Sequence, residues 1–161
     1  MRIWLFVLLL ATALPGKSQS PITPGDAEVG RAVRTFARTV AHDVTGEGPS
    51  AWSRYFSEGP SFFMVVNGQM IFPNGAAARA AMPELQRRFR RIELEWGDDL
   101  RVDPLSPNLA VMAASYHEIQ ALATGETVDE RGFFTGVAEL RDGRWRFRDC
   151  HWSSVRPAAG R

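Results

Sequence analysis

Residues 109–155, LAVMAASYHEIQALATGETVDERGFFTGVAELRDGRWRFRDCHWSSV, decide the fold of this chain. The stretch contains three long runs rich in strand-favouring residues, which are 109–123, 128–140 and 144–155. The segments between the runs, Thr124–Thr127 and Arg141–Gly143, are hairpin-sized and contain glycine. We therefore expect three strands that pair antiparallel in chain order.

Helical segments precede these strands. Thr23–Asp26 has the features of a helix start, with threonine as the N-cap and proline at the first helical position. Apolar residues then recur at steps of three and four, which is typical of one helix face, and these are Val29, Val33, Phe36, Val40 and Val44. Gly46–Pro49 ends this helix, and residues 50–56 predict a second, brief helix.

A tight hairpin follows the helices. Phe62–Val66 and Gln69–Phe72 are strand-like, and Asn67-Gly68 between them is a strong two-residue turn signal. Residues 75–91 then have a helical pattern, although Pro83 predicts a break or kink near Ala81-Met82.

The region before the long strands alternates in polarity. Ile92, Leu94 and Trp96 alternate with glutamates, which predicts a half-buried strand, and residues 103–108 predict a turn. Helices first and strands joined by tight turns afterwards indicate an α+β domain, with the helices packed on one face of an antiparallel sheet.

The N-terminus has the features of a secretory signal peptide. Arg2 precedes an apolar run over residues 3–14, which is shorter than the about 20 residues that span a bilayer. We expect residues 1–20 to be removed. Residues 21–161 would then form one secreted or periplasmic domain, with no membrane attachment after cleavage.

Composition excludes several kinds of chemistry. Loss of Arg2 and Lys17 lowers the basic count from 19 to 17 against 18 acidic residues, so a nearly neutral mature domain gives no case for nucleic acid. Lys17 is the only lysine, which excludes lysine chemistry from the mature chain. Cys150 is the only cysteine, so neither an intramolecular disulfide nor a thiolate zinc site can form. Nucleotide and nicotinamide fingerprints are absent, and we expect no cofactor.

The terminal strand carries a family resemblance. Asp142-Gly143, then Trp145, and then His151 and Ser153 six and eight residues further on, resemble the last strand of the SnoaL-like branch of the nuclear transport factor 2-like superfamily. The same ending is similar to the association domain of calcium/calmodulin-dependent protein kinase. The resemblance implies a cone-shaped, strongly curved sheet that encloses a pocket behind N-terminal helices. It leaves function open, because such folds include both enzymes and non-catalytic binding domains.

Alternation along the last strand suggests a catalytic pair. Trp145, Phe147, Asp149, His151 and Ser153 share one face, and Arg146, Arg148, Cys150 and Trp152 share the other. Because two arginines favour water, we expect the first face to line the concavity. His151 is then a candidate general base or acid, and Asp149 a candidate partner or water activator. The alternative is a structural His151 that is hydrogen-bonded within the sheet.

The preceding strand and the aromatic residues supply candidate ligand contacts. Ser115 and His117 share a face, and we expect them to line the pocket, with Glu118 as an exposed charge. Further candidates are Trp52, Tyr55, Trp96, Phe134 and Ser153, although aromatic residues with this spacing usually form core. No local spacing indicates a metal site, even if His117, His151 and Asp149 met on one wall.

These observations leave two functions open. The first is binding of a small apolar or partly polar molecule without chemistry. The second is a cavity enzyme of isomerase, hydrolase or dehydratase type that uses His151 and Asp149. We also expect a homodimer, with Trp152 as the interface anchor.

Overall fold

The computed structural model describes residues 24–155. The helical elements are α1 (Pro24–Glu47), the short 3-10 helix η1 (Gly48–Ala51), α2 (Trp52–Tyr55) and α3 (Gly75–Arg88). The strands are β1 (Phe63–Val66), β2 (Gln69–Phe72), β3 (Phe89–Trp96), β4 (Arg101–Ser106), β5 (Leu109–Leu122), β6 (Thr127–Arg141) and β7 (Arg144–Ser154). The predicted signal peptide, residues 1–20, lies outside the described residues.

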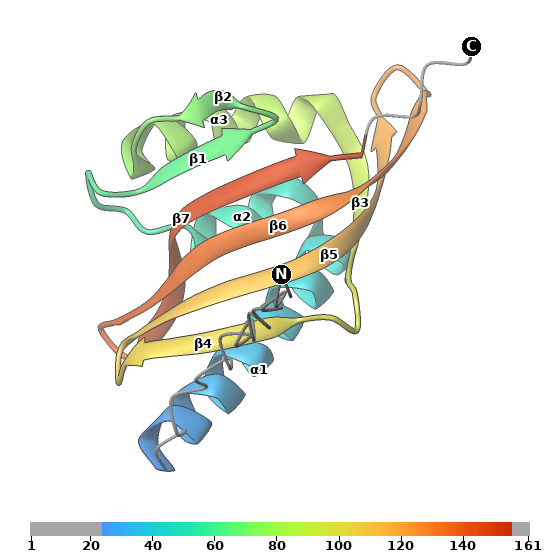
Figure 1. Ribbon diagram of the computed structural model, residues 1–161. Coiled ribbons are helices and arrows are strands. Elements are labelled where there is room, and N and C mark those ends of the chain that lie inside the picture. The colour runs from blue at the N-terminus through green and yellow to red at the C-terminus, as the bar shows by residue number, and fades with distance from the viewer. Residues whose placement is uncertain (1–23, 156–161) are drawn as a thin grey trace, which may run out of the picture.

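The strands form one curved, open sheet in the order β2-β1-β7-β6-β5-β3, and β4 also pairs with β5. Pairing is antiparallel throughout except between β1 and β7, which run parallel. The helices cover one face, called here the inner face, and leave the outer face open (Figure 1). The predicted α+β fold and its three long antiparallel strands are therefore confirmed.

Helix α1 packs on the sheet through its predicted apolar stripe. All five stripe residues are buried: Val29, Val33, Phe36, Val40 and Val44. Polar contacts fix the position of the helix, because Trp96 Nε1 donates to the Ala37 carbonyl oxygen at 2.8 Å and the Thr45 hydroxyl accepts from Leu94 N at 3.0 Å. Helix α1 is thus held along β3, at the edge of the inner face.

The hairpin of β1 and β2 turns at Asn67-Gly68, as predicted. Both residues have positive φ, 50° and 80°, which asparagine and glycine tolerate best. The Asn67 side chain also joins the hairpin to the end of β7, because its Oδ1 accepts from Ser154 N at 2.7 Å and its Nδ2 donates to the Ser154 hydroxyl at 3.1 Å. The hairpin is thereby fixed beside β7.

A β-bulge interrupts β7. Val137 of β6 pairs with Asp149, but the next residue, Ala138, pairs with Phe147, so Arg148 is an extra residue with no partner of its own. One inserted residue reverses the alternation of everything beyond it. Phe147 is therefore buried on the same face as Cys150 and Trp152. The prediction that the side chains of this strand alternate between the two faces without interruption is therefore wrong at Arg148.

Two local predictions also differ from the structure. Helix α3 runs through Pro83 without a break. The proline removes only the hydrogen bond to the Arg79 carbonyl, and both residues lie on the exposed side of the helix, where water can replace the bond. The predicted turn at 103–108 is largely strand β4, which contains Pro104. Proline has no backbone N–H to donate to a neighbouring strand. Because β4 is an edge strand, it can contain a proline without breaking the hydrogen bonding of the sheet.

The predicted dimer anchor is misplaced, because Trp152 is only 7% exposed and belongs to the core. The outer face instead carries exposed aromatic side chains, among them Phe63 at 39% and Phe133 at 45% exposure. We propose that a homodimer forms through this outer face, since aromatic residues are typical interface anchors.

Phe133→Glu should convert that dimer to monomer, because it places a charge in the apolar centre of the proposed interface. Light scattering at micromolar concentration measures the mass of each form. Ala80→Glu, on an exposed position of α3, is the matched control and should remain dimeric. A wild-type protein that is monomeric under these conditions would contradict the proposal.

Candidate ligand-binding cavity

A cavity of about 290 Å³ lies between the inner face of the sheet, the β1–β2 hairpin and the end of α3. Most of its lining is apolar and comes from Pro49, Trp52, Phe56, Met64, Val66, Ile71, Phe72, Leu85, Phe89, Ile92 and Trp152. Its polar lining consists of Arg88, Glu118, Gln120 and Glu130. A concave apolar site with a few polar groups is the usual form of a small-molecule site.

The strands place two of these polar groups opposite each other. Glu118 of β5 pairs directly with Glu130 of β6. Tyr116, two residues before Glu118 and only 3% exposed, identifies their common side as the inner face. Directly opposed residues have Cβ atoms about 5 Å apart, so two acidic side chains lie beside each other at the wall of the cavity.

Each carboxyl group of this pair accepts one hydrogen bond from an uncharged side chain. Gln120 Nε2 donates to Glu118 Oε1 at 2.6 Å, and the Tyr116 hydroxyl donates to Glu130 Oε1 at 2.7 Å. The Tyr116 oxygen also lies 3.5 Å from the Ser154 hydroxyl. Within residues 24–155, no arginine or histidine forms an ion pair with either glutamate.

This environment changes the acidity of Glu118. Burial raises the pKa of Glu118 from 4.5 to about 7, the negative charge of Glu130 adds to the rise, and the hydrogen bond from Gln120 opposes it. Burial also raises the pKa of Tyr116 above its ordinary value, so the hydroxyl stays protonated and remains a donor. Glu118 can therefore gain or lose a proton near neutral pH.

Gly132 allows Tyr116 to reach across β6. A Cβ atom at position 132 would lie 2.0 Å from the Ser153 carbonyl oxygen and 2.8 Å from Cε1 of the Tyr116 ring. Any larger residue would displace that ring. The glycine thus keeps the space through which the tyrosine hydroxyl reaches Glu130 and Ser154.

Aromatic rings form the apolar wall beside the carboxyl pair. Trp152 packs edge-on against Tyr116, with ring centroids 4.8 Å apart, and against Trp52 at 5.9 Å. Trp96 stacks on Trp152 at 5.6 Å, and Phe134 packs against it at 4.6 Å. Trp152 therefore belongs both to the core and to the cavity wall.

The predicted catalytic pair lies elsewhere. Because of the bulge at Arg148, His151 and Asp149 lie on the outer face, where His151 is exposed. Ser153 is exposed on the same face and donates its hydroxyl hydrogen to the Phe133 carbonyl oxygen at 3.1 Å. The structure keeps these three residues together but does not place them in the cavity.

The predicted contacts on β5 also lie on the outer face. The Ser115 hydroxyl and backbone nitrogen donate to Asp99 Oδ1 at 2.8 Å and 2.9 Å, and His117 Nε2 lies 2.9 Å from Asp129 Oδ1. The inner face instead presents Tyr116 and Glu118, so the expectation that Glu118 is an exposed charge was wrong. The available signal was the alternation Tyr116-x-Glu118-x-Gln120, in which the tyrosine favours burial.

The predicted aromatic contacts divide between cavity and core. Trp52 lines the cavity. The Tyr55 hydroxyl donates to Asp43 at the end of α1, which gives it a structural role. Trp96 is tied to α1 and Phe134 is fully buried, so both lie behind the cavity wall and not on it.

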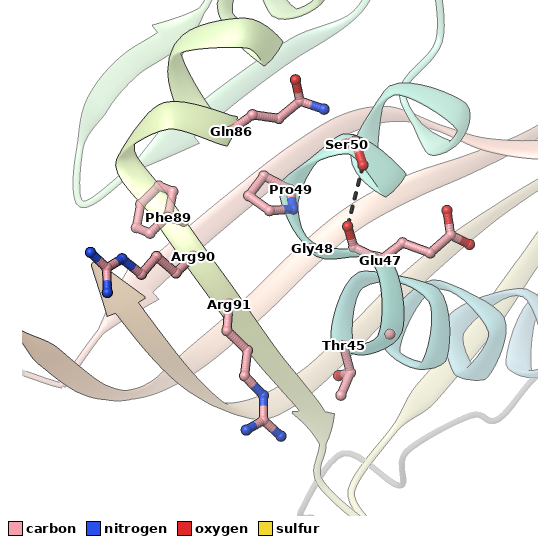
Figure 2. A pocket seen from close by; sticks show the side chains of 10 residues that line it. Thr45, Glu47, Gly48, Pro49, Ser50, Gln86, Phe89, Arg90 and Arg91 are labelled. Carbon is pink, nitrogen blue, oxygen red and sulfur yellow. Dashed lines mark hydrogen bonds between the residues drawn. The ribbon is translucent and has the colours of Figure 1, made fainter. Parts of the chain in front are cut away.

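A larger cavity of about 490 Å³ lies beside the first, between the end of α1, η1 and the start of β3 (Figure 2). Pro49 and Phe89 border both cavities. Its charged lining is already engaged, because Arg91 pairs with Glu93 at 2.8 Å and Arg90 Nη2 donates to the Ala123 carbonyl oxygen at 3.0 Å. Burial, aromatic walls and the shifted carboxyl group make the smaller cavity the better candidate site.

Metal-binding clusters and membrane-spanning helices are both absent from residues 24–155. No group of three or more histidine, cysteine, aspartate and glutamate side chains there is arranged to hold a metal ion. No helix in that range is both long and apolar enough to cross a membrane.

Comparison with known proteins identifies the fold. No family model and no curated protein matches the sequence. A nuclear transport factor 2-like superfamily protein from Salmonella enterica superposes with a TM-score of 0.64 at 13% identity, covering 84% of this chain and 94% of that one.

Two further solved structures are similar. A "putative scytalone dehydratase" from Novosphingobium aromaticivorans has a TM-score of 0.66 at 15% identity, covering 81% of this chain and 85% of that one. A "putative calcium/calmodulin dependent protein kinase II association domain" from Xanthomonas campestris has a TM-score of 0.62 at 17% identity, covering 89% and 92%. The chain therefore has the nuclear transport factor 2-like fold, and at these identities the likeness extends to the fold alone.

The pKa of Glu118 predicts an unusual pH dependence of stability. Between pH 4.5 and about 7 the folded protein keeps a proton on Glu118 that the unfolded chain releases. The free energy of unfolding should therefore fall as pH rises through this window. Relative to Glu118→Gln, the wild type should lose up to about 3 kcal/mol.

Urea unfolding measured across this pH range gives the difference. Glu126→Gln, in an exposed turn, is the matched control and should follow the wild type. Parallel curves for the wild type and Glu118→Gln would show that the Glu118 carboxyl group titrates as an exposed one.

Proposed function

We propose that this protein binds a small, mostly apolar molecule in the inner-face cavity. The observation that carries the proposal is a cavity lined by aromatic side chains, among them Trp52 and Trp152, that also contains the Glu118–Glu130 carboxyl pair. The aromatic wall provides apolar contact, and the carboxyl pair provides orientation and selectivity. The apolar run of residues 3–14 supports action outside the cytoplasm, in the periplasm or after secretion.

General acid–base catalysis is the second candidate, and one observation favours it. A carboxyl group whose pKa is raised to about 7 can both accept and donate a proton at neutral pH, as a catalytic acid or base must. In this alternative Glu118 transfers the proton, and Glu130 with the Tyr116 hydroxyl hydrogen-bonds the substrate. Glu118 thus takes the role that the sequence suggested for His151.

Ligand occupancy distinguishes an open cavity from a packed core. Native mass spectrometry of the protein purified from its own compartment should show an added small molecule, which extraction then identifies. Val66→Trp places a large ring in the cavity from β1 and should abolish this added mass while circular dichroism stays unchanged. His151→Ala, on the outer face, is the control and should retain the molecule.

If Val66→Trp does not fold, Leu85→Phe fills the same cavity from α3 and replaces it. An added mass retained in the filled variant but lost in His151→Ala would contradict the proposed site. Catalysis would appear as conversion of the bound molecule by the wild type. A loss of conversion of about 10²-fold or more in Glu118→Gln, with binding kept, would favour the enzyme.

A further inference from the structure

The charge balance at the cavity wall indicates what kind of molecule the cavity accepts. Glu118 and Glu130 face each other with only neutral donors, Gln120 and Tyr116, bonded to them. Two carboxylates that share a partly dehydrated site repel each other, and burial increases the repulsion. When both groups are ionised, the site therefore carries negative charge that no ion pair within residues 24–155 compensates.

Two events can relieve this repulsion. A proton on Glu118 removes one negative charge, and a monovalent cation placed beside the two groups attracts both and offsets one of the two charges. The surrounding aromatic rings favour the second event, because the faces of tryptophan and phenylalanine attract organic cations. Trp52, Trp152, Phe56 and Phe72 all line the same cavity as the carboxyl pair.

We infer that the cavity binds a compact organic ammonium ion, with its cationic nitrogen against Glu118 and Glu130 and its apolar body against Trp52 and Trp152. This inference rests on the proposed function, because it assigns the ligand class of that same cavity. The charged pair selects the ammonium group, and the apolar lining rejects small hydrated inorganic cations.

The other charged group of the cavity is compatible with this assignment. Arg88, at the end of α3, is an exposed residue, and its guanidinium lies over the Phe89 ring at 5.2 Å from the centroid. Water screens its charge more strongly than that of the half-buried carboxyl pair. Helix α3 contributes no other charged side chain to the cavity lining, and the β1–β2 hairpin contributes none.

Three probes of similar size test the inference: benzyltrimethylammonium, 3-phenylpropan-1-ol and 3-phenylpropanoate. Titration calorimetry should show the cation binding at least about tenfold more tightly than the alcohol, and the anion binding most weakly. Benzyltrimethylammonium has no proton to lose. Its affinity should therefore rise with pH through about 7, as Glu118 ionises.

Glu118→Gln should lower the affinity for the cation about tenfold or more and remove its pH dependence, and should change the affinity for the alcohol much less. Glu126→Gln should change neither. Equal affinity for cation and alcohol would overturn the ammonium inference and leave the proposed binding function intact. Preference for the anion would overturn it in favour of Arg88 as the selective group. Absence of binding by all three would overturn it as well, and native mass spectrometry would still test the binding function separately.

Discussion

One extra residue in the last strand determines which side chains this domain encloses. Because Arg148 has no partner on β6, the residues beyond it change face, and Cys150 and Trp152 enter the core. Trp152 then meets rings from α2, β3, β5 and β6. Without the bulge, His151 would occupy the inner face and Trp152 would lie outside, so both the core and the cavity depend on it.

The inner face is closely packed at one end and contains the cavity at the other. Towards one end, Phe134, Phe147 and Met112 are fully buried beneath α1. Towards the other end, α1 gives way to the short elements η1 and α2, and the cavity remains. Glu118 and Glu130 lie in that second half, beside apolar rings, and no basic side chain of residues 24–155 forms an ion pair with them. Retaining such a pair lowers stability at neutral pH, which is understandable if a ligand completes the site.

Much of the fold could be predicted from the sequence, because periodicity and turn chemistry are local. The α1 stripe, the Asn67-Gly68 hairpin and the three long strands all agree with the structure. The candidate site could not be predicted, because the bulge arises from pairing with β6 and leaves no clear local mark. The orientation of β5 left only one signal, the tyrosine at position 116, since its period of two leaves either face possible until the helices cover one of them (Figure 1). Trp52 alone among the predicted contacts lines the cavity.

The cavity depends on Glu118, which points into it from the inner face and shares it with Glu130. Carboxyl carbon NMR measures this directly, by following the chemical shift of the Glu118 side-chain carboxyl group as pH is raised. The expected midpoint is about 7, well above the ordinary 4.5, and it should move down when Glu130 is replaced by glutamine. A midpoint near 4.5 that stays the same after this substitution would show that Glu118 is exposed to water and does not share the cavity with Glu130.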